Sequence, residues 1–373
     1  MASILFVSKP VVPPWNDSGK NLVRDLACNL TRYRAQVMVR AGERAELGRC
    51  SLAPIYAAHS GGFAPGLTDQ ARVFAHMLGS RGHDAWHFFF APNPRSCLAG
   101  RAATRMRRVP SIHTLSSAPR DPRAIVNQLF ADTNVVLSQH TERQLRDAGL
   151  AADRLCRIAP AIEPLTPLSP QERAYARASF QLGMADPVIV YPGDLEFGEG
   201  ATLMVEALRE RALTGATLVM ACRAKTVRAQ AAEAALHERV RTLGLHDRVR
   251  FLGETPHIHA LLGCADVVAL PSTDLYAKMD YPLVLLEAMS LSVPVIVAQG
   301  SPAAELCEGD AARAVAASAE ALAASLAALL QDSVERRALG ERGRAAVQAR
   351  YTGASMAAHY ERAYDQLLGR RAG

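Results

Sequence analysis

The sequence lacks several features that would identify a disulfide-bonded or membrane-spanning protein. Its seven cysteines are odd in number and widely spaced, and none form a Cys-x-x-Cys pair. This argues against a disulfide framework and against a zinc knuckle. No apolar run approaches the ~18 residues that a transmembrane helix requires, and the segment Met1–Val7 lacks the basic region and cleavage motif of a secretory signal. These absences predict a cytoplasmic protein with buried free thiols.

Aromatic residues are also scarce, at 6% of the chain. Hydrophobic residues nevertheless make up 49% and charged residues 21%, which is the composition of a globular protein with a substantial core. We therefore expect aliphatic and alanine-rich packing. The 373 residues are enough for two domains of ordinary size.

Positive charge is concentrated in the first half of the chain. Residues 1–165 contain 21 Lys and Arg against 12 Asp and Glu, whereas residues 166–373 contain 21 against 24. A basic half suits an anionic partner, namely a phosphorylated ligand or an acidic lipid surface, although a solvated arginine-rich face is the alternative. The cluster from Arg101 to Arg108 has two interpretations as well: a peripheral contact with the inner face of a membrane, or a solvated face. No nucleic-acid motif accompanies the charge, so we expect no nucleic-acid partner.

Short apolar runs alternate with alanine-rich helical stretches on both sides of a proline-rich joint at residues 160–170. This rhythm predicts an α/β protein with two doubly wound parallel sheets. We expect a first domain at residues 1–162, a second at 163–353 and a C-terminal helix at 354–373. The expected strands are Ile4–Val7, Gln36–Val39, Ala85–Phe90, Ser111–Thr114, Val135–Leu137, Leu155–Ile158, Val188–Tyr191, Thr217–Ala221, Val249–Leu252, Val267–Leu270 and Val293–Val297.

The strongest local signal is a predicted helix start at Pro282, after the strand Val267–Leu270 and a polar loop. Proline is favoured in the first turn of a helix. The backbone N–H groups of Leu283 and Val284 would then be available to bind an anion such as pyrophosphate. Glu287 lies about one turn further, where its carboxylate can accept hydrogen bonds from both hydroxyls of a ribose. The alternative is that Glu287 is an ordinary salt-bridge partner.

Segments along nearly the whole chain resemble the retaining glycosyltransferases of family 4, the group 1 glycosyltransferases with the GT-B fold. The resemblance is carried by Pro13–Leu30, Ile112–Thr114, Val188–Leu208, Leu243–Ser272, Val293–Leu306 and Leu339–Tyr351. It implies two Rossmann-like domains that face each other across a cleft. It also implies that the first domain binds the acceptor, that the second binds a sugar nucleotide, and that the final helix crosses back onto the first domain.

The same resemblance assigns roles to individual residues. It implies that Glu287 holds the ribose, that Gly253 and Thr255 meet the base, and that His113 contacts the transferred sugar. The residues expected to bind the donor are Gly19, Gly193, Arg223, Lys225, Gly253, Thr255, Asp280, Leu283, Val284 and Glu287. The expected catalytic residues are His113, Lys20 and Lys278, and the expected acceptor or phosphate contacts are Lys9, Trp15 and Arg95.

Three positions depart from the family pattern. The first glutamate of the paired-glutamate motif is Met279 here, and the usual arginine and lysine phosphate ligands are replaced by Asp194 and Glu199. Because negative charge develops on a departing diphosphate, fixed donors or cations must stabilise it. We expect the cations to be relocated to Lys278, Arg223 and the Lys20 loop.

Several functions therefore stay open. The first is a metal-independent retaining glycosyltransferase that uses a UDP- or GDP-sugar as co-substrate and no cofactor, with a small molecule, a glycan or a lipid-linked glycan as acceptor. The second is a GT-B scaffold that binds a sugar nucleotide without transfer, and the third is a sugar-nucleotide epimerase. The pair His257 and His259 has no evident third ligand, so no metal is expected. A nicotinamide dehydrogenase is disfavoured because no G-x-G-x-x-G follows Ile4–Val7.

Overall fold

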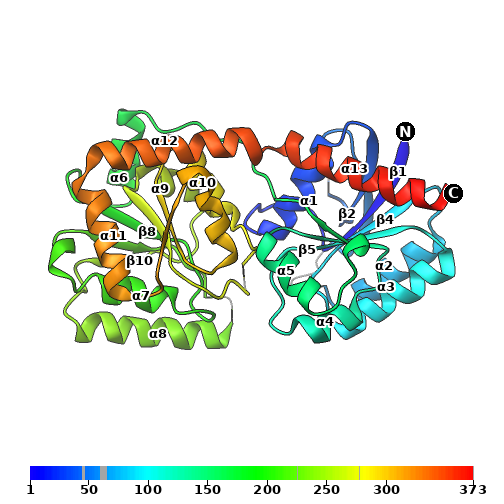
Figure 1. The fold of residues 1–373 in the computed structure, drawn as a ribbon, viewed down its shortest axis with the longest axis horizontal. Helices are drawn as coiled ribbons and strands as arrows, with labels where there is room; N and C mark the ends of the chain where they lie inside the picture. The colour runs from blue at the N-terminus through cyan, green and yellow to red at the C-terminus, as the bar shows by residue number, and fades with distance from the viewer. Residues whose placement is uncertain (44–46, 59–64, 225, 277, 373) are drawn as a thin grey trace. The chain divides into compact units, whose positions relative to one another are not determined.

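The computed structural model describes residues 1–43, 47–58, 65–224, 226–276 and 278–372. The chain forms two compact units. Unit 1 comprises Met1–Glu163 and Tyr351–Gly373, and unit 2 comprises Pro164–Arg350. Each unit is built on its own parallel sheet with flanking helices (Figure 1). The predicted fold class of two Rossmann-like parallel-sheet domains is confirmed.

In the described part of unit 1, seven strands form one parallel sheet in the order β3-β2-β1-β4-β5-β6-β7. The strands are β1 (Ala2–Ser8), β2 (Tyr33–Arg40), β3 (Ser51–Tyr56), β4 (Ala85–Phe89), β5 (Ser111–Leu115), β6 (Thr133–Val136) and β7 (Leu155–Arg157). The helices are α1 (Ser18–Asn29), α2 (Leu67–Gly79), α3 (Pro94–Arg107), α4 (Pro122–Gln128), α5 (Gln139–Asp147), the 3-10 turn η1 (Ala152–Arg154) and α13 (Gly353–Ala372). The centre of β1, Ile4–Phe6, is fully buried, as expected of a parallel strand covered on both faces.

Unit 2 repeats this plan with six described strands in the order β10-β9-β8-β11-β12-β13. The strands are β8 (Val188–Tyr191), β9 (Thr217–Met220), β10 (Val249–Phe251), β11 (Val267–Leu270), β12 (Val295–Ala298) and β13 (Arg313–Val315). The helices are α6 (Pro170–Ser179), α7 (Gly200–Ala207), α8 (Val227–Thr242), α9 (Ile258–Cys264), α10 (Leu283–Ser290), α11 (Ala319–Gln331) and α12 (Ser333–Arg350), with 3-10 turns η2 (Arg211–Leu213) and η3 (Pro302–Asp310). Figure 1 shows α9 and α10 above this sheet and α7 and α8 below it.

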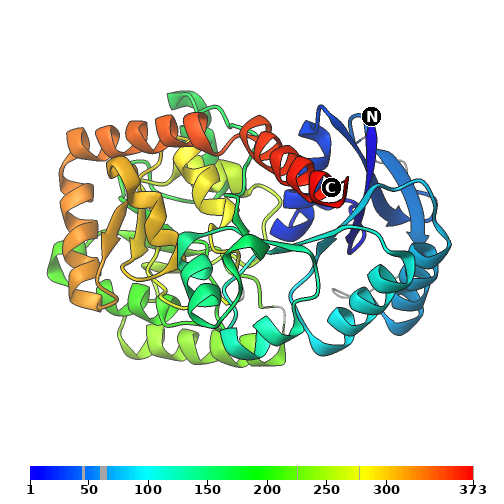
Figure 2. The same cartoon turned by 45° about the vertical axis from the view of Figure 1, so that its right-hand side comes forward.

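The helix α13 completes unit 1, although it follows unit 2 in the sequence. Figures 1 and 2 show it beside α1, with which it is in contact. Tyr360 and Tyr364 are fully buried, and the Tyr364 hydroxyl lies 2.7 Å from His87 Nδ1 on β4. The Glu361 carboxylate accepts the backbone N–H of Arg32 at 2.7 Å. Apolar burial and buried polar contacts therefore both hold this helix in unit 1.

Each sheet has one place where the strand order reverses. In unit 1 it lies between β1 and β4, and in unit 2 between β8 and β11. At such a point the connections after the two strands leave in opposite directions, and ligands bind beyond the carboxyl ends of the strands. In unit 2 this places the segment after Tyr191 near the segment after Leu270. These loops are where the candidate site is built.

Candidate functional site

The start of α10 contains several of the predicted donor residues. The helix begins at Leu283, one residue later than predicted, because Pro282 keeps an extended ψ of 119° and serves as the cap residue. Leu283 and Val284 therefore occupy the first turn, whose N–H groups have no acceptor inside the helix. Asp280, just before the cap, is fully buried. The geometry is that of a helix start able to receive an anion.

Glu287 lies one turn into α10 and its side chain is 17% exposed. Its Oε1 atom lies 3.5 Å from Nε2 of His259, on α9. The hydrogen bond to Glu287 raises the pKa of His259, while burial acts in the opposite direction. This contact was not predicted, because His259 was considered only with His257 as a pair without a third metal ligand. A prediction of the short helix α9 would have placed His259 next to α10.

Lys278 lies at the reversal of strand order in unit 2, in the loop after β11. Its Nζ donates to the carbonyl oxygen of Pro192, directly after β8, at 3.3 Å. Burial lowers the pKa of Lys278, while Cys222 and Asp194 nearby raise it and Arg223 lowers it further. The loops after three strands, β8, β9 and β11, thus meet around one ammonium group. This is a cation in the position where the fold places ligands.

Arg223 follows β9 and is joined to the loop after β10. Its guanidinium pairs with the Glu254 carboxylate at 2.9 Å, and Glu254 lies between Gly253 and Thr255. Gly253 has a φ of +68°, which favours glycine. The structure therefore brings three predicted donor residues together at the ends of neighbouring strands. Lys225, also predicted to bind the donor, lies outside the described residues.

Asp194 and Glu199, the acids at the positions where the resemblance implies phosphate-binding cations, both hold loops. The Asp194 carboxylate accepts the backbone N–H groups of Glu196 at 2.8 Å and Phe197 at 3.0 Å, which closes the turn after β8. Glu199 accepts the N–H of Thr273 at 2.9 Å and its hydroxyl at 2.8 Å. Glu199 thereby ties the segment before α7 to the loop after β11. In this chain the two positions fix the shape of the loops that carry Lys278.

Two tyrosines that the sequence analysis did not single out shape the same loops. Tyr191 is buried at the end of β8 and its hydroxyl donates to the Asp194 carbonyl at 3.0 Å. A Cβ atom on Gly193 would overlap the Tyr191 ring, so the backbone can approach this ring so closely only at a glycine. Tyr281 donates to the Glu305 carboxylate at 2.7 Å, which anchors the loop just before α10. The contact of Tyr281 has no local sequence signal, because Glu305 lies 24 positions away.

In unit 1, the loop between β1 and α1 brings Lys9, Gly19 and Lys20 together. Lys9 pairs with the Asp17 carboxylate at 2.5 Å, and Asp17 caps α1 by accepting the Lys20 N–H at 3.0 Å. The Lys20 ammonium donates to two carbonyl oxygens of the preceding loop, each at 2.8 Å. A Cβ on Gly19 would lie 3.2 Å from Asp17 Oδ1, so this close approach favours glycine. Both lysines thus stabilise the conformation of the loop.

Trp15 and Arg95, the other predicted acceptor or phosphate contacts, lie on different elements of unit 1. The Trp15 ring centre lies 4.9 Å from the Arg24 guanidinium, a cation–π contact with α1. Arg95 is exposed in the first turn of α3, shortly after the end of β4. Their predicted roles in binding stay predictions.

His113 is fully buried on β5. Its Nε2 lies 2.8 Å from the carbonyl oxygen of Phe90 and therefore carries the proton that it donates. Burial lowers the pKa of His113 to about 4, so the ring is neutral at pH 7. Nδ1 is then a bare acceptor, buried and without a partner among the described residues. A buried acceptor without a partner is unusual in a folded protein and calls for an explanation.

The lowered pKa of His113 predicts a loss of stability in acid. The pKa of a histidine in the unfolded chain is about 6.5, so between pH 7 and 5 the unfolded state gains a proton that folded His113, with a pKa of about 4, does not. This one group should lower the free energy of unfolding by about 2 kcal/mol over that range. Urea unfolding at the two pH values should show a smaller loss for His113→Gln. His246→Gln, at an exposed histidine, serves as the control, and an equal loss in wild type and His113→Gln would contradict the assignment.

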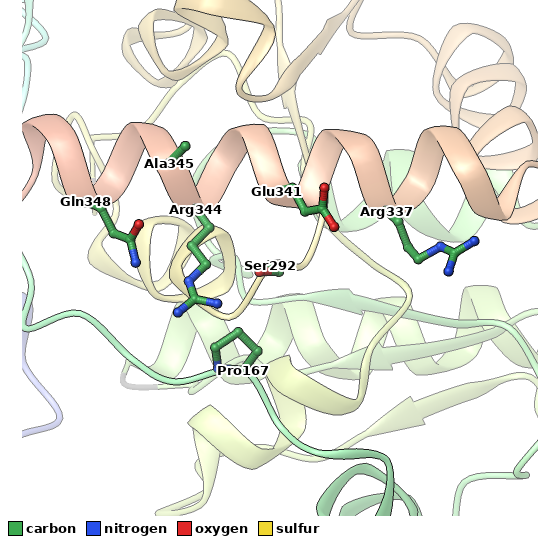
Figure 3. Close-up of a pocket in the computed structure, with 7 residues that line it drawn as sticks. All are labelled: Pro167, Ser292, Arg337, Glu341, Arg344, Ala345 and Gln348. Atoms are coloured by element: carbon green, nitrogen blue, oxygen red, sulfur yellow. The ribbon is translucent and has the colours of Figure 1, made fainter.

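A surface cavity of about 470 Å³ lies elsewhere in unit 2. Figure 3 shows Arg337, Glu341 and Arg344 projecting from α12 around it. Its lining is Pro167, Ser292, Arg337, Glu341, Arg344, Ala345 and Gln348, none of which is a predicted donor residue.

In the described ranges, no three His, Cys, Asp or Glu side chains are grouped as metal ligands. Within the same ranges, no helix combines the length and the hydropathy needed to span a bilayer.

Comparison with known proteins gives one family and a set of solved structures. Residues 173–346 match the family described as Glycosyl transferases group 1. No curated protein matches the sequence. Anabaena HepE, solved in complex with UDP-glucose, is 18% identical with a TM-score of 0.78, over 98% of this chain and 100% of that chain. Sucrose-phosphate synthase from Thermosynechococcus elongatus is 21% identical with a TM-score of 0.78, over 99% and 100%. A glycosyltransferase from Rickettsia africae is 16% identical with a TM-score of 0.76, over 98% of both chains.

At these identities the structural likeness establishes the fold, while the family match concerns unit 2 and its strand-end loops. The chain therefore has the GT-B fold of these glycosyltransferases, and its residues 173–346 match the group 1 glycosyltransferase family.

Proposed function

We propose that the protein is a glycosyltransferase that transfers a sugar from a nucleoside-diphosphate sugar to an acceptor with retention of configuration. The observation that carries this proposal is the grouping of cations with a helix start. Lys278 and Arg223 lie at strand ends of the unit that matches the family, and the first turn of α10 leads to Glu287. HepE, a structural relative, was solved with UDP and with UDP-glucose, which supports a UDP-sugar as the donor.

The proposed role of Lys278 follows from the charge that develops during transfer. As the bond between the anomeric carbon and the phosphate oxygen breaks, negative charge builds on the departing diphosphate. Preorganised donors around this oxygen stabilise the transition state. Lys278 and the N–H groups of Leu283 and Val284 supply such donors, with Arg223 available when it leaves Glu254. We propose that these groups, without a divalent ion or another cofactor, stabilise the leaving group, so that EDTA should leave turnover unchanged.

The remaining contacts of the donor follow from hydrogen-bond chemistry. Glu287 is a carboxylate that accepts from the two ribose hydroxyls, and the backbone around Gly253 and Thr255 meets the base. In unit 1, the bare Nδ1 of His113 is an acceptor for a hydroxyl, which we assign to the sugar being transferred. The Lys9 and Lys20 loop offers positive charge to phosphates or to an anionic acceptor.

The acceptor and the place of reaction stay proposals. The helix α3 exposes Leu98 and Met106 and carries arginines but no acid along its length. Such a face suits a cytoplasmic enzyme that meets a lipid-linked glycan at the surface of an anionic membrane. A small soluble acceptor is the alternative.

A second function, sugar-nucleotide binding without transfer, is favoured by one observation. Asp194 and Glu199 occupy the family's cation positions and are committed to loop hydrogen bonds. If Lys278 and Arg223 do not replace the lost charge, the donor would bind and not react.

A thermal-shift screen against UDP-glucose, UDP-N-acetylglucosamine and GDP-mannose, followed by a nucleotide-release assay, separates these functions. A donor present at 100 times its dissociation constant should add about 2.7 kcal/mol of stability. A stabilising donor that also releases UDP or GDP supports the transferase. Stabilisation without release over several acceptors supports the binding protein, and a flat response to the whole panel contradicts the donor site.

A further inference from the structure

Two cysteines of unit 1 lie in direct contact although 22 positions separate them in the sequence. Cys28 is exposed near the end of α1, and Cys50 is partly buried immediately before β3. A side-chain interaction between the two thiols lowers the pKa of Cys28 and raises that of Cys50. Both are free thiols in this structure.

A tight turn holds Cys50 against α1. The N–H of Cys50 donates to the Leu47 carbonyl at 3.1 Å, which closes the turn. Gly48, inside the turn, has a φ of +59°, a conformation that favours glycine. A Cβ on Gly48 would lie 3.6 Å from Cys28 Cα and 3.8 Å from Cys28 Cβ. The turn therefore packs on the backbone of Cys28, and the two thiols are held as neighbours by local structure.

The two thiols differ in the way that thiol–disulfide exchange requires. The side-chain interaction with Cys50 lowers the pKa of Cys28, and Arg24 acts in the same direction while burial and Asp25 oppose it. In contrast, burial raises the pKa of the thiols elsewhere in the chain, at Cys97, Cys156, Cys222, Cys264 and Cys307. The thiolate is the nucleophile in such reactions. Cys28 is thus the exposed, more acidic thiol, and Cys50 is the adjacent resolving thiol.

We propose that Cys28 and Cys50 form a site of reversible oxidation that takes a glutathione-type disulfide as its oxidant. The Cys28 thiolate attacks one sulfur of the oxidant, forms a mixed disulfide and releases one glutathione as thiolate. Cys50 then loses its proton to solvent and attacks the Cys28 sulfur, which forms the Cys28–Cys50 bond and releases the second glutathione. Two protein thiols are oxidised to one disulfide, and one glutathione disulfide is reduced to two thiols.

The site concerns unit 1 and is independent of the proposed donor loops of unit 2. The new bond would tie the end of α1 to the start of β3, and cross-linking restricts the unfolded chain. In a reducing compartment, disulfides of this kind are transient and regulatory rather than structural. Oxidation should therefore raise the thermal midpoint of unit 1 relative to the reduced protein.

The test is incubation of the full chain with glutathione disulfide, followed by acid quenching, intact mass measurement and peptide mapping. Wild type should lose the mass of two hydrogens and yield one peptide pair joined through Cys28 and Cys50. Cys50→Ser should stop at a stable mixed disulfide on Cys28, because the resolving thiol is missing. Cys28→Ser should gain neither the cross-link nor the adduct at this site. The matched control is Cys307→Ser, at a partly buried cysteine with a raised pKa, and it should cross-link as wild type does.

Other outcomes would overturn the proposal. A wild-type product that remains a mixed disulfide would show that Cys50 does not resolve it. A cross-link through another cysteine, or a disulfide-linked dimer, would show that the contact does not direct the reaction. An unchanged mass for wild type would show that the pair is inert. Unfolding of the serine variants does not confuse the result, because the wild type and Cys307→Ser carry the test by themselves.

Discussion

Replacement of Lys278 by Met is expected to lower kcat by about 10²–10³-fold, the effect of removing one preorganised donor from a developing oxyanion. The ammonium group is held at the reversal of the sheet by the Pro192 carbonyl, next to Asp194. Met keeps the length and the apolar stem of lysine and removes only the charge and the donors. Because the lost interaction strengthens in the transition state, kcat should fall more than donor affinity. The measurement is steady-state release of UDP or GDP together with donor binding by calorimetry.

Two further variants make this result specific. Lys278→Arg retains the charge and should recover part of the activity. Arg241→Met removes a positive charge from an exposed side chain on α8 and should leave kcat unchanged. A loss of less than about tenfold in Lys278→Met, or about 1.4 kcal/mol in activation free energy, would contradict a role at the leaving group.

Replacement of Glu287 by Ala is expected to weaken donor binding about 100-fold. Two ribose hydroxyls donating to one carboxylate make hydrogen bonds to a charged group, and together these are worth about 3 kcal/mol. Glu287 is largely shielded from water, and the partly exposed His259 is its ionic neighbour among the residues that the structure describes. The readout is the dissociation constant of the nucleoside diphosphate, measured by calorimetry at pH 7.

The controls for Glu287 separate ribose binding from its contact with His259. Glu238→Ala removes an exposed glutamate from α8 and should leave affinity unchanged. His259→Ala removes the neighbour without touching the carboxylate, so its effect should be much smaller than that of Glu287→Ala. Equal nucleotide affinity in Glu287→Ala and wild type would contradict the proposal that Glu287 binds the ribose. Far-ultraviolet circular dichroism confirms that each variant is folded.

Strands with continuous apolar runs were predictable, and strands without them were not. Val188–Tyr191 and Val267–Leu270 have the same bounds in β8 and β11 as in the sequence prediction. The strand β3, Ser51–Tyr56, was missed because Pro54 interrupts it and only Ala53 and Tyr56 of its residues are buried. Proline is tolerated there because β3 lies at the edge of the sheet. Edge strands lack the continuous hydrophobicity that makes central strands recognisable.

The long helix α12 was not predicted, for a different reason. Its buried residues include Gly340 and Gly343 beside Leu339 and Val347, so the buried face lacks an apolar stripe. A Cβ at Gly340 would overlap the Ser292 carbonyl. The helix thus packs partly through the backbone of its glycines, and a search for hydrophobic periodicity does not detect such contacts.

The strand-end loops of the candidate site were predictable, while their internal contacts were not. The alternation of strands and helices predicts that the loops after β8 and β11 lie at the same edge of the sheet. Lys278, Asp194 and Glu199 were predicted to lie in these loops. The sequence did not show that Glu199 ties two loops together or that Lys278 donates to Pro192, because Thr273 lies 74 positions from Glu199 and Pro192 lies 86 positions from Lys278. Such pairings depend on register and on side-chain direction, neither of which a local pattern encodes.

The return of α13 to unit 1 has a consequence for the order in which the protein is made. Residues 164–350 form a continuous unit, so every internal contact of unit 2 joins residues that are synthesised before α13. Unit 1 at that moment still lacks Tyr360 and Tyr364, which fill its interior beside His87. Because chains emerge from the N-terminus onward, the half that is begun first is finished last. Until α13 packs onto unit 1, the surface that Tyr360 and Tyr364 bury beside His87 stays uncovered.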